Sequence, residues 1–139
     1  MMSLERAARA AVDAIVAATH EAGFVVAIAV VDEHGDLVAA HRMEGCRPRW
    51  MRASIRKAYT AAVMDRDTAA FHDELVRRSL ALSGYGDALF TSLPGGIIVT
   101  DAQGATIAGI GVTGPTQGRD AELAQAGAAA FEGKRRAGG

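Results

Sequence analysis

The chain has 139 residues, a formal net charge of −1, one cysteine and 50% hydrophobic residues. This length predicts one domain, residues 1–139, with a substantial core. The charge argues against nucleic-acid binding, which needs excess Lys and Arg, and the lone Cys46 excludes intramolecular disulfides and CxxC motifs. No apolar run approaches a membrane span and no secretory signal opens the chain, so we expect a cytoplasmic protein without a membrane partner.

The first half of the chain predicts a helix, a hairpin and two further helices. Ser3 can cap the first helix and Gly23 can close it, because apolar residues between them recur every three or four positions. Residues 24–31 and 37–42 are predicted strands joined by the turn 33–36. A helix is expected over 48–65, and the next begins at Asp67 or Thr68 and carries Leu82. Both should cross the sheet.

The second half predicts another hairpin, residues 96–100 and 106–113, and a last helix for which Thr116 is the expected cap. The order is α-β-β-α-α-β-β-(β)-α. Tight turns between strands require antiparallel pairing. We therefore predict an α+β fold with an antiparallel sheet of about five strands, flanked by helices.

Residues 109–114 form an apolar run punctuated by three glycines. In an extended strand Ile110 and Val112 point to one side, while Gly109, Gly111 and Thr113 point to the other. The bare side admits close approach by either a ligand or another segment of backbone. Beyond it, Gly114 leads to a helix start whose free N–H groups can bind an anion.

Basic residues cluster at the start of the helix predicted over 48–65. Arg49, Arg52 and Arg56 share one helical face, where they either grip a carboxylate or phosphate or remain solvated. Lys57 adjoins the apolar face, so we expect partial burial, a lowered pKa and a role as anion ligand or base. Arg119, in the first turn of the last helix, is a second candidate for anion binding.

The four histidines lack metal-ligand spacing, and His41 is the best candidate for a metal ligand or an acid/base. It ends a strand on the same predicted face as Leu37 and Ala39; the alternative is a surface histidine. An aromatic pocket is a further expectation, although a role in the core is the alternative for Tyr59 and Met51. Its candidate lining residues are Met43, Trp50, Met51, Tyr59 and Tyr85.

Four stretches together resemble the GlcG/HbpS-like family, also found as the C-terminal domain of PduO-type proteins. They are residues 27–32 with Gly35, residues 37–39 followed by 42–45, residues 57–62, and residues 109–114 followed by Asp120 and Gly127. The characteristic family positions fall on Arg42, Met43, Gly45, Lys57, Thr60, Gly96, Gly111 and Gly114. The chain departs from the family pattern at His41 and Glu44.

The resemblance implies a profilin-like fold, assembly into dimers or larger homo-oligomers and, as in some members, haem or corrinoid association. We therefore expect a small-molecule-binding domain whose ligand is haem or another planar or anionic organic molecule. Arg49, Arg52 or Lys57 would neutralise carboxylates and His41 would be the axial ligand of haem iron. The alternative is a cofactor-independent enzyme for a small carboxylated or aromatic metabolite. Lys57 or His41 would then be its acid/base, and Gly111, Thr113 or Arg119 would hold an oxyanion.

Overall fold

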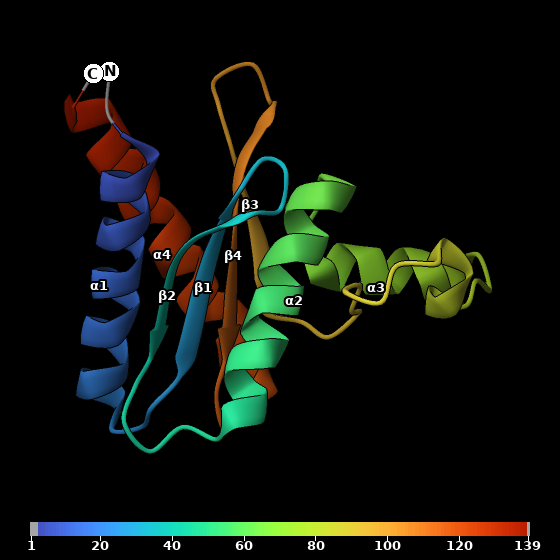
Figure 1. The fold of residues 1–139 in the computed structure, drawn as a ribbon, viewed down its shortest axis with the longest axis horizontal. Helices are drawn as coiled ribbons and strands as arrows, with labels where there is room; N and C mark the ends of the chain where they lie inside the picture. The colour runs from blue at the N-terminus through green and yellow to red at the C-terminus, as the bar shows by residue number, and fades with distance from the viewer. Residues whose placement is uncertain (1–2, 139) are drawn as a thin grey trace.

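The computed structural model describes residues 3–138 (Figure 1). Among these residues there are four α-helices, one 3₁₀ helix and four strands. The elements in chain order are α1 (Leu4–Ala22), β1 (Ala27–Asp32), β2 (Leu37–Arg42), α2 (Pro48–Met64), α3 (Thr68–Arg77), η1 (Leu82–Tyr85), β3 (Gly96–Thr100), β4 (Thr106–Thr113) and α4 (Gln117–Gly138).

Local sequence signals set the ends of the first helices. The Ser3 side chain accepts a hydrogen bond from Arg6 N, and Gly23 closes α1 in a left-handed conformation with φ of 83°. Pro48 occupies the first turn of α2, where its missing N–H costs nothing. The predictions for α1 and α2 are confirmed.

The prediction for α3 was too long, because this helix ends at Arg77 and Leu82 lies in η1. Ser79 adopts a positive φ of 53°, and the N–H of Leu80 bonds back to Leu75 O. This is a helix C-terminal turn rather than a further helical turn. The helix also projects away from the body and meets the sheet only beside β3 (Figure 1), so α2 alone crosses this face.

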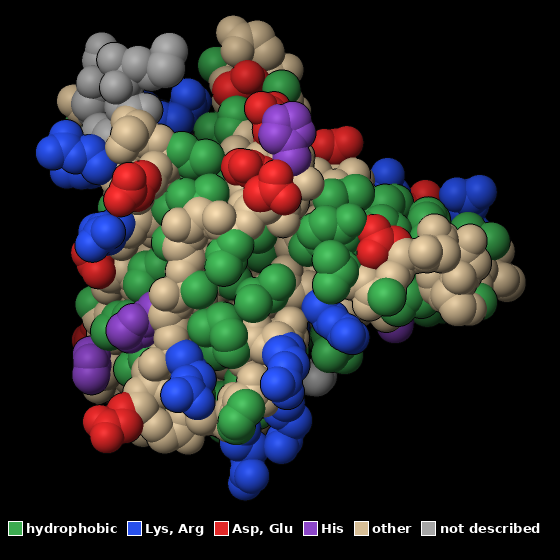
Figure 2. Space-filling model, viewed as in Figure 1, with side chains coloured by type: hydrophobic (Ala, Val, Ile, Leu, Met, Phe, Trp, Pro, Cys, Tyr) green, Lys and Arg blue, Asp and Glu red, His purple; other side chains and the backbone are tan. Residues whose placement is uncertain are grey.

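The strands form one antiparallel sheet in the order β2-β1-β4-β3. It has four strands rather than about five, and the α+β prediction is confirmed. Helices α1 and α4 cover one face, while α2 covers the other over β1, β4 and β3 (Figure 1). The same face of β2 is uncovered there, and Leu37 is 53% exposed. Figure 2 shows hydrophobic side chains gathered over this part of the sheet, between β2 and α2.

The backbone of α2 lies directly on the bare face of β4. A Cβ atom added to Gly111 would lie 2.0 Å from Ser54 O, and one added to Gly109 would lie 2.3 Å from Ala58 O. A Cβ on Gly96, in β3, would lie 2.4 Å from Lys57 O. The sequence left open whether a ligand or a backbone segment fills the glycine face, and the structure places backbone there.

This close packing makes Gly111 a position where one methyl group should be costly. We expect Gly111→Ala to destabilise the protein by about 3 kcal/mol or more, because the helix must move off the sheet to accept the new carbon. Urea denaturation measures the loss. Gly133→Ala is the matched control, since nothing lies within 4 Å of its added carbon, and it should stabilise α4 slightly. Equal effects of the two substitutions would contradict the packing.

Candidate functional site

A cleft of about 490 Å³ opens on one flank of α2, between its first turns and the segment that joins β4 to α4. Volumes of this size accommodate small organic ligands. Its lining residues are Arg49, Trp50, Ala53, Lys57, Leu93, Thr113, Gly114 and Pro115. The cleft thus combines the start of α2, the loop before β3 and the end of β4.

One wall of the cleft is apolar and aromatic. Trp50 is half-buried and packs against the main core, so its indole is held in place, while Leu93 remains 43% exposed. Pro115 adds a further apolar surface. An anchored indole with apolar neighbours suits a flat organic ring, which stacks on it or meets its edge.

The mouth of the cleft favours negative charge. Arg49 is exposed and lines the cleft, where its guanidinium can pair with a carboxylate of a ligand. The first turn of α4 begins at Gln117, two residues beyond Pro115, but no described residue of α4 lines the cleft, and Arg119 N in that turn donates to Thr116 O at 3.1 Å. Arg49 is therefore the group of the lining that attracts an anionic part of a ligand.

A buried ion pair lies behind the cleft wall. Lys57 Nζ donates to Val112 O at 2.8 Å and to Asp120 Oδ2 at 3.2 Å, and both charged side chains are only 1% exposed. The pair therefore ties α2 to β4 and to the first turn of α4. The backbone N–H of Gly114 also donates to the Asp120 carboxylate and favours its charged form.

Burial dominates the titration of both members of the pair. Loss of solvation lowers the pKa of Lys57, opposed by the charge of Asp120. Loss of solvation likewise raises the pKa of Asp120, opposed by the charge of Lys57. Lys57 was expected to be partly buried, and the structure buries it completely.

Ser54 and Thr113 form a second polar link between α2 and β4. Ser54 Oγ lies 2.8 Å from Ala27 O and 2.8 Å from Thr113 Oγ1, and the Ser54 side chain is buried. Because a carbonyl only accepts, the single Ser54 proton belongs to Ala27 O. Thr113 must then donate its own proton to Ser54. The Thr113 oxygen keeps only lone pairs for any other partner.

The structure places His41 far from this cleft. His41 pairs with Ile28 and Ala39 with Val30, on the α1 side of the sheet, where His41 lines a groove of about 300 Å³ with Glu5 and Asp13 of α1. The expected shared face with Leu37 is wrong. A bulge between Val30 and Val31 shifts the register, so Leu37 pairs with Val31 on the α2 side.

Met43 and Arg119 also lie outside the cleft lining. The Met43 sulfur is buried and accepts from Thr19 Oγ1 at 3.3 Å and from Val26 N at 3.4 Å, which is a structural role. The guanidinium of Arg119 lies 5.3 Å from the centre of the Phe24 ring. Arg42 and Arg52 are exposed, and Gly96 and Gly111 lie beneath α2.

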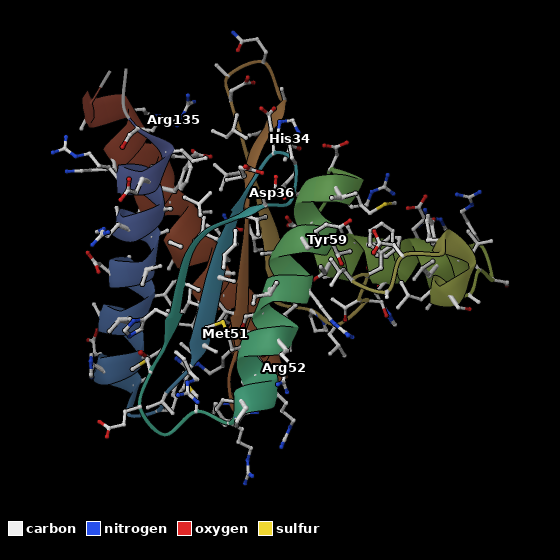
Figure 3. All side chains as sticks on the ribbon, viewed as in Figure 1. His34, Asp36, Met51, Arg52, Tyr59 and Arg135 are labelled. Carbon is white, nitrogen blue, oxygen red and sulfur yellow. The ribbon has the colours of Figure 1, made fainter. Side chains whose placement is uncertain are left out.

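Tyr59 lies on α2 and packs against the arm, which is the part of the chain from α3 to residue 90 that projects from the body, rather than lining the cleft. Its hydroxyl donates to Asp87 at 2.6 Å, and its ring lies 6.0 Å from that of Phe90, in a cluster that includes Phe71 and Tyr85. Figure 3 shows Tyr59 on the part of α2 near this arm and Arg52 near the start of the helix. Of the candidate residues, the cleft gathers Lys57, Arg49, Trp50, Thr113 and Gly114.

Comparison with known proteins identifies the family of this chain. The profile described as haem-degrading protein HbpS-like matches residues 3–129. The chain belongs to the HbpS-like family. An HbpS double mutant from Streptomyces reticuli superposes with a TM-score of 0.82 at 34% identity, covering 92% of this chain and 85% of that one.

Two further relatives extend the comparison. Protein GlcG of Escherichia coli strain K12 is 38% identical over 89 residues, which span 63% of this chain and 63% of GlcG. A structure described as a PduOC haem complex shares the fold, with a TM-score of 0.79 at 23% identity, covering 90% of this chain and 91% of that one.

Ser54 and Asp120 were absent from the predicted site of this HbpS-like chain. Asp120 carried a usable signal, because its spacing from Ala124, Ala128 and Phe131 puts a charge on the buried stripe of α4. Ser54 carried none, since a serine within a helix is ordinary. Within residues 3–138, no three or more His, Cys, Asp or Glu side chains are placed to hold a metal ion. No helix described there has the length and apolar character needed to span a bilayer.

We expect Lys57→Met to cost about 3–5 kcal/mol near neutral pH, because Asp120 is then buried without its counter-charge. In this variant the pKa of Asp120 should rise further. As the pH falls, Asp120 therefore takes up a proton in the folded state at a higher pH than in the unfolded state. The loss should therefore shrink as pH falls through that raised pKa toward the ordinary value of 3.8. Urea denaturation across this range measures it.

The double variant Lys57→Met with Asp120→Asn is the control, since it removes both charges. Its loss should be smaller than that of Lys57→Met and nearly independent of pH. A loss in Lys57→Met that stays constant from neutral to acid pH would contradict the buried pair.

Proposed function

We propose that the protein binds a planar, anionic organic molecule in the Trp50 cleft. The observation that carries the proposal is the combination of a half-buried indole at Trp50 and an exposed Arg49 around one cavity of about 490 Å³. A ring would lie against Trp50, with its carboxylate directed to Arg49.

Haem is the candidate ligand that the family suggests. The family description names haem degradation, and PduOC is described in complex with haem. The Trp50 indole and Arg49 offer contacts to a flat macrocycle and to its carboxylates. The cleft does not suit iron ligation, because proteins ligate haem iron through His, Cys, Met or Tyr, and no described residue lining the cleft is one of these. We infer binding through ring and carboxylate contacts without an axial ligand from this cleft.

Metal-free protoporphyrin and haem should therefore bind with affinities within about threefold of each other, a difference under 1 kcal/mol. Trp50→Ala should weaken both by about tenfold or more through loss of the aromatic wall. Arg49→Ala should weaken both by a smaller factor. Absorbance titrations of the purified protein measure all of these affinities.

Arg56→Ala is the matched control for Arg49→Ala, since Arg56 is an exposed arginine of the same helix outside the cleft lining. It should leave both affinities unchanged. Binding of haem without binding of the metal-free porphyrin would contradict the proposed mode. Unchanged affinities in Trp50→Ala would exclude this cleft.

We also propose that the protein self-associates through the uncovered side of β2. Support comes from the exposure of Leu37 and from the hydrophobic side chains between β2 and α2 in Figure 2, since a contiguous apolar surface commonly marks an interface.

Sedimentation should give at least twice the chain mass of 14.4 kDa for the wild type and a smaller mass for Leu37→Asp. Leu80→Asp, at a residue 40% exposed on the arm, is the control and should keep the assembly. A monomeric wild type would contradict the proposal.

A further inference from the structure

Among the side chains that line the cleft, Thr113 has a hydroxyl whose proton is held by a buried neighbour, Ser54. Arg49 and the Trp50 indole only donate, and Lys57 is committed to Val112 O and Asp120. Thr113 would ordinarily donate or accept, because a free hydroxyl rotates to suit its partner. Its contact with Ser54 removes that freedom.

The number of hydroxyl protons determines which group donates in the hydrogen bonds that join Thr113, Ser54 and Ala27 O. Ser54 is fully buried and has one hydroxyl proton for two oxygen neighbours, each 2.8 Å away. In the opposite arrangement Ser54 would donate to Thr113. The carbonyl oxygen of Ala27 would then face a lone pair of Ser54 Oγ at 2.8 Å. Two lone-pair-bearing oxygens at that distance repel, so the order runs from Thr113 to Ser54 to Ala27 O.

We propose that Thr113 acts as an obligate acceptor and makes the cleft selective for ligands that carry an N–H or O–H donor on the ring. This inference rests on the proposed function, because it assumes that a planar anion occupies the Trp50 cleft. For a ligand small enough to bring its ring edge to Thr113, the preferred class becomes an aromatic carboxylate whose ring donates to Thr113 Oγ1 while its carboxylate meets Arg49. The pyrrole nitrogens of a porphyrin lie at the centre of the macrocycle and do not reach Thr113, so this preference does not separate haem from metal-free protoporphyrin. A ring acceptor at the same place would meet the Thr113 lone pairs and be rejected.

Two probes isolate this effect. Indole-3-acetate and benzofuran-3-acetate share ring size and carboxylate and differ in a ring N–H against a ring oxygen. Calorimetric titration of the full chain should show indole-3-acetate binding about tenfold more tightly, which corresponds to one hydrogen bond made against one left unmade.

Two variants separate selectivity from folding. Thr113→Val keeps the side-chain shape, removes the acceptor and should bring the two affinities within about twofold. Ser54→Ala keeps the Thr113 hydroxyl but frees its proton, so Thr113 can turn and donate, and benzofuran-3-acetate should bind more tightly than to the wild type. A merely structural role for Thr113 would weaken both probes equally.

Equal affinities of the two probes for the wild type would overturn the inference and leave the proposed function standing. An unchanged preference in Thr113→Val would also overturn it. If neither probe binds, the inference is also overturned. The proposed function fails too only if protoporphyrin does not bind either.

Discussion

The contact between the α2 backbone and the glycine face of β4 and β3 determines how α2 lies on the sheet and which of its side chains face inward. Carbonyl oxygens of Ser54, Lys57 and Ala58 occupy space that a side chain on the strands would fill. Glycine permits this approach at the cost of side-chain packing on the sheet. The short distance fixes both the height and the rotation of α2 above the sheet.

That rotation decides which residues meet which partners. It turns Ser54 and Lys57 inward, where their polar ends reach Ala27 O, Thr113 and Val112 O. Buried polar groups are tolerable because these partners are in place. The same rotation leaves Trp50 and Arg49 on the flank that faces the start of α4, so the cleft is a consequence of how the helix is seated.

Asp120 connects this seating to the fourth helix. Its carboxylate meets Lys57 from the first turn of α4, so the position of that helix start is tied to α2 by charge rather than by apolar contact alone. A buried pair of this kind adds little net stability, but it penalises every arrangement in which one partner is missing. The ion pair therefore fixes the distance between α2 and the start of α4 on this flank of the molecule.

Much of the fold was predictable because its signals are local. Ser3, Gly23 and Pro48 mark helix ends through their own backbone chemistry, and the tight turns imply antiparallel strands. The family resemblance was likewise readable from short stretches, and Lys57 stood out as a charge beside an apolar face. These features need no knowledge of distant contacts.

What escaped prediction depends on contacts between distant segments. The glycine run fitted both a ligand and a backbone neighbour, and only the path of α2 separates them. His41 was misplaced relative to Leu37 because a bulge opposite Val30 and Val31 changes strand parity without any sequence signature. The role of Ser54 rests on Ala27 and Thr113, which are 27 and 59 residues away.

The proposed ligand binds beside α2, in the Trp50 cleft, and not in the groove that His41 lines. Two-dimensional NMR of the protein titrated with metal-free protoporphyrin distinguishes these two places. We expect shifts of the Trp50 indole N–H and of the Thr113 and Gly114 amides, with the signals of Ala39, His41 and Asp13 unmoved. Shifts concentrated at Ala39, His41 and Asp13, with the Trp50 signal unchanged, would contradict binding in the Trp50 cleft.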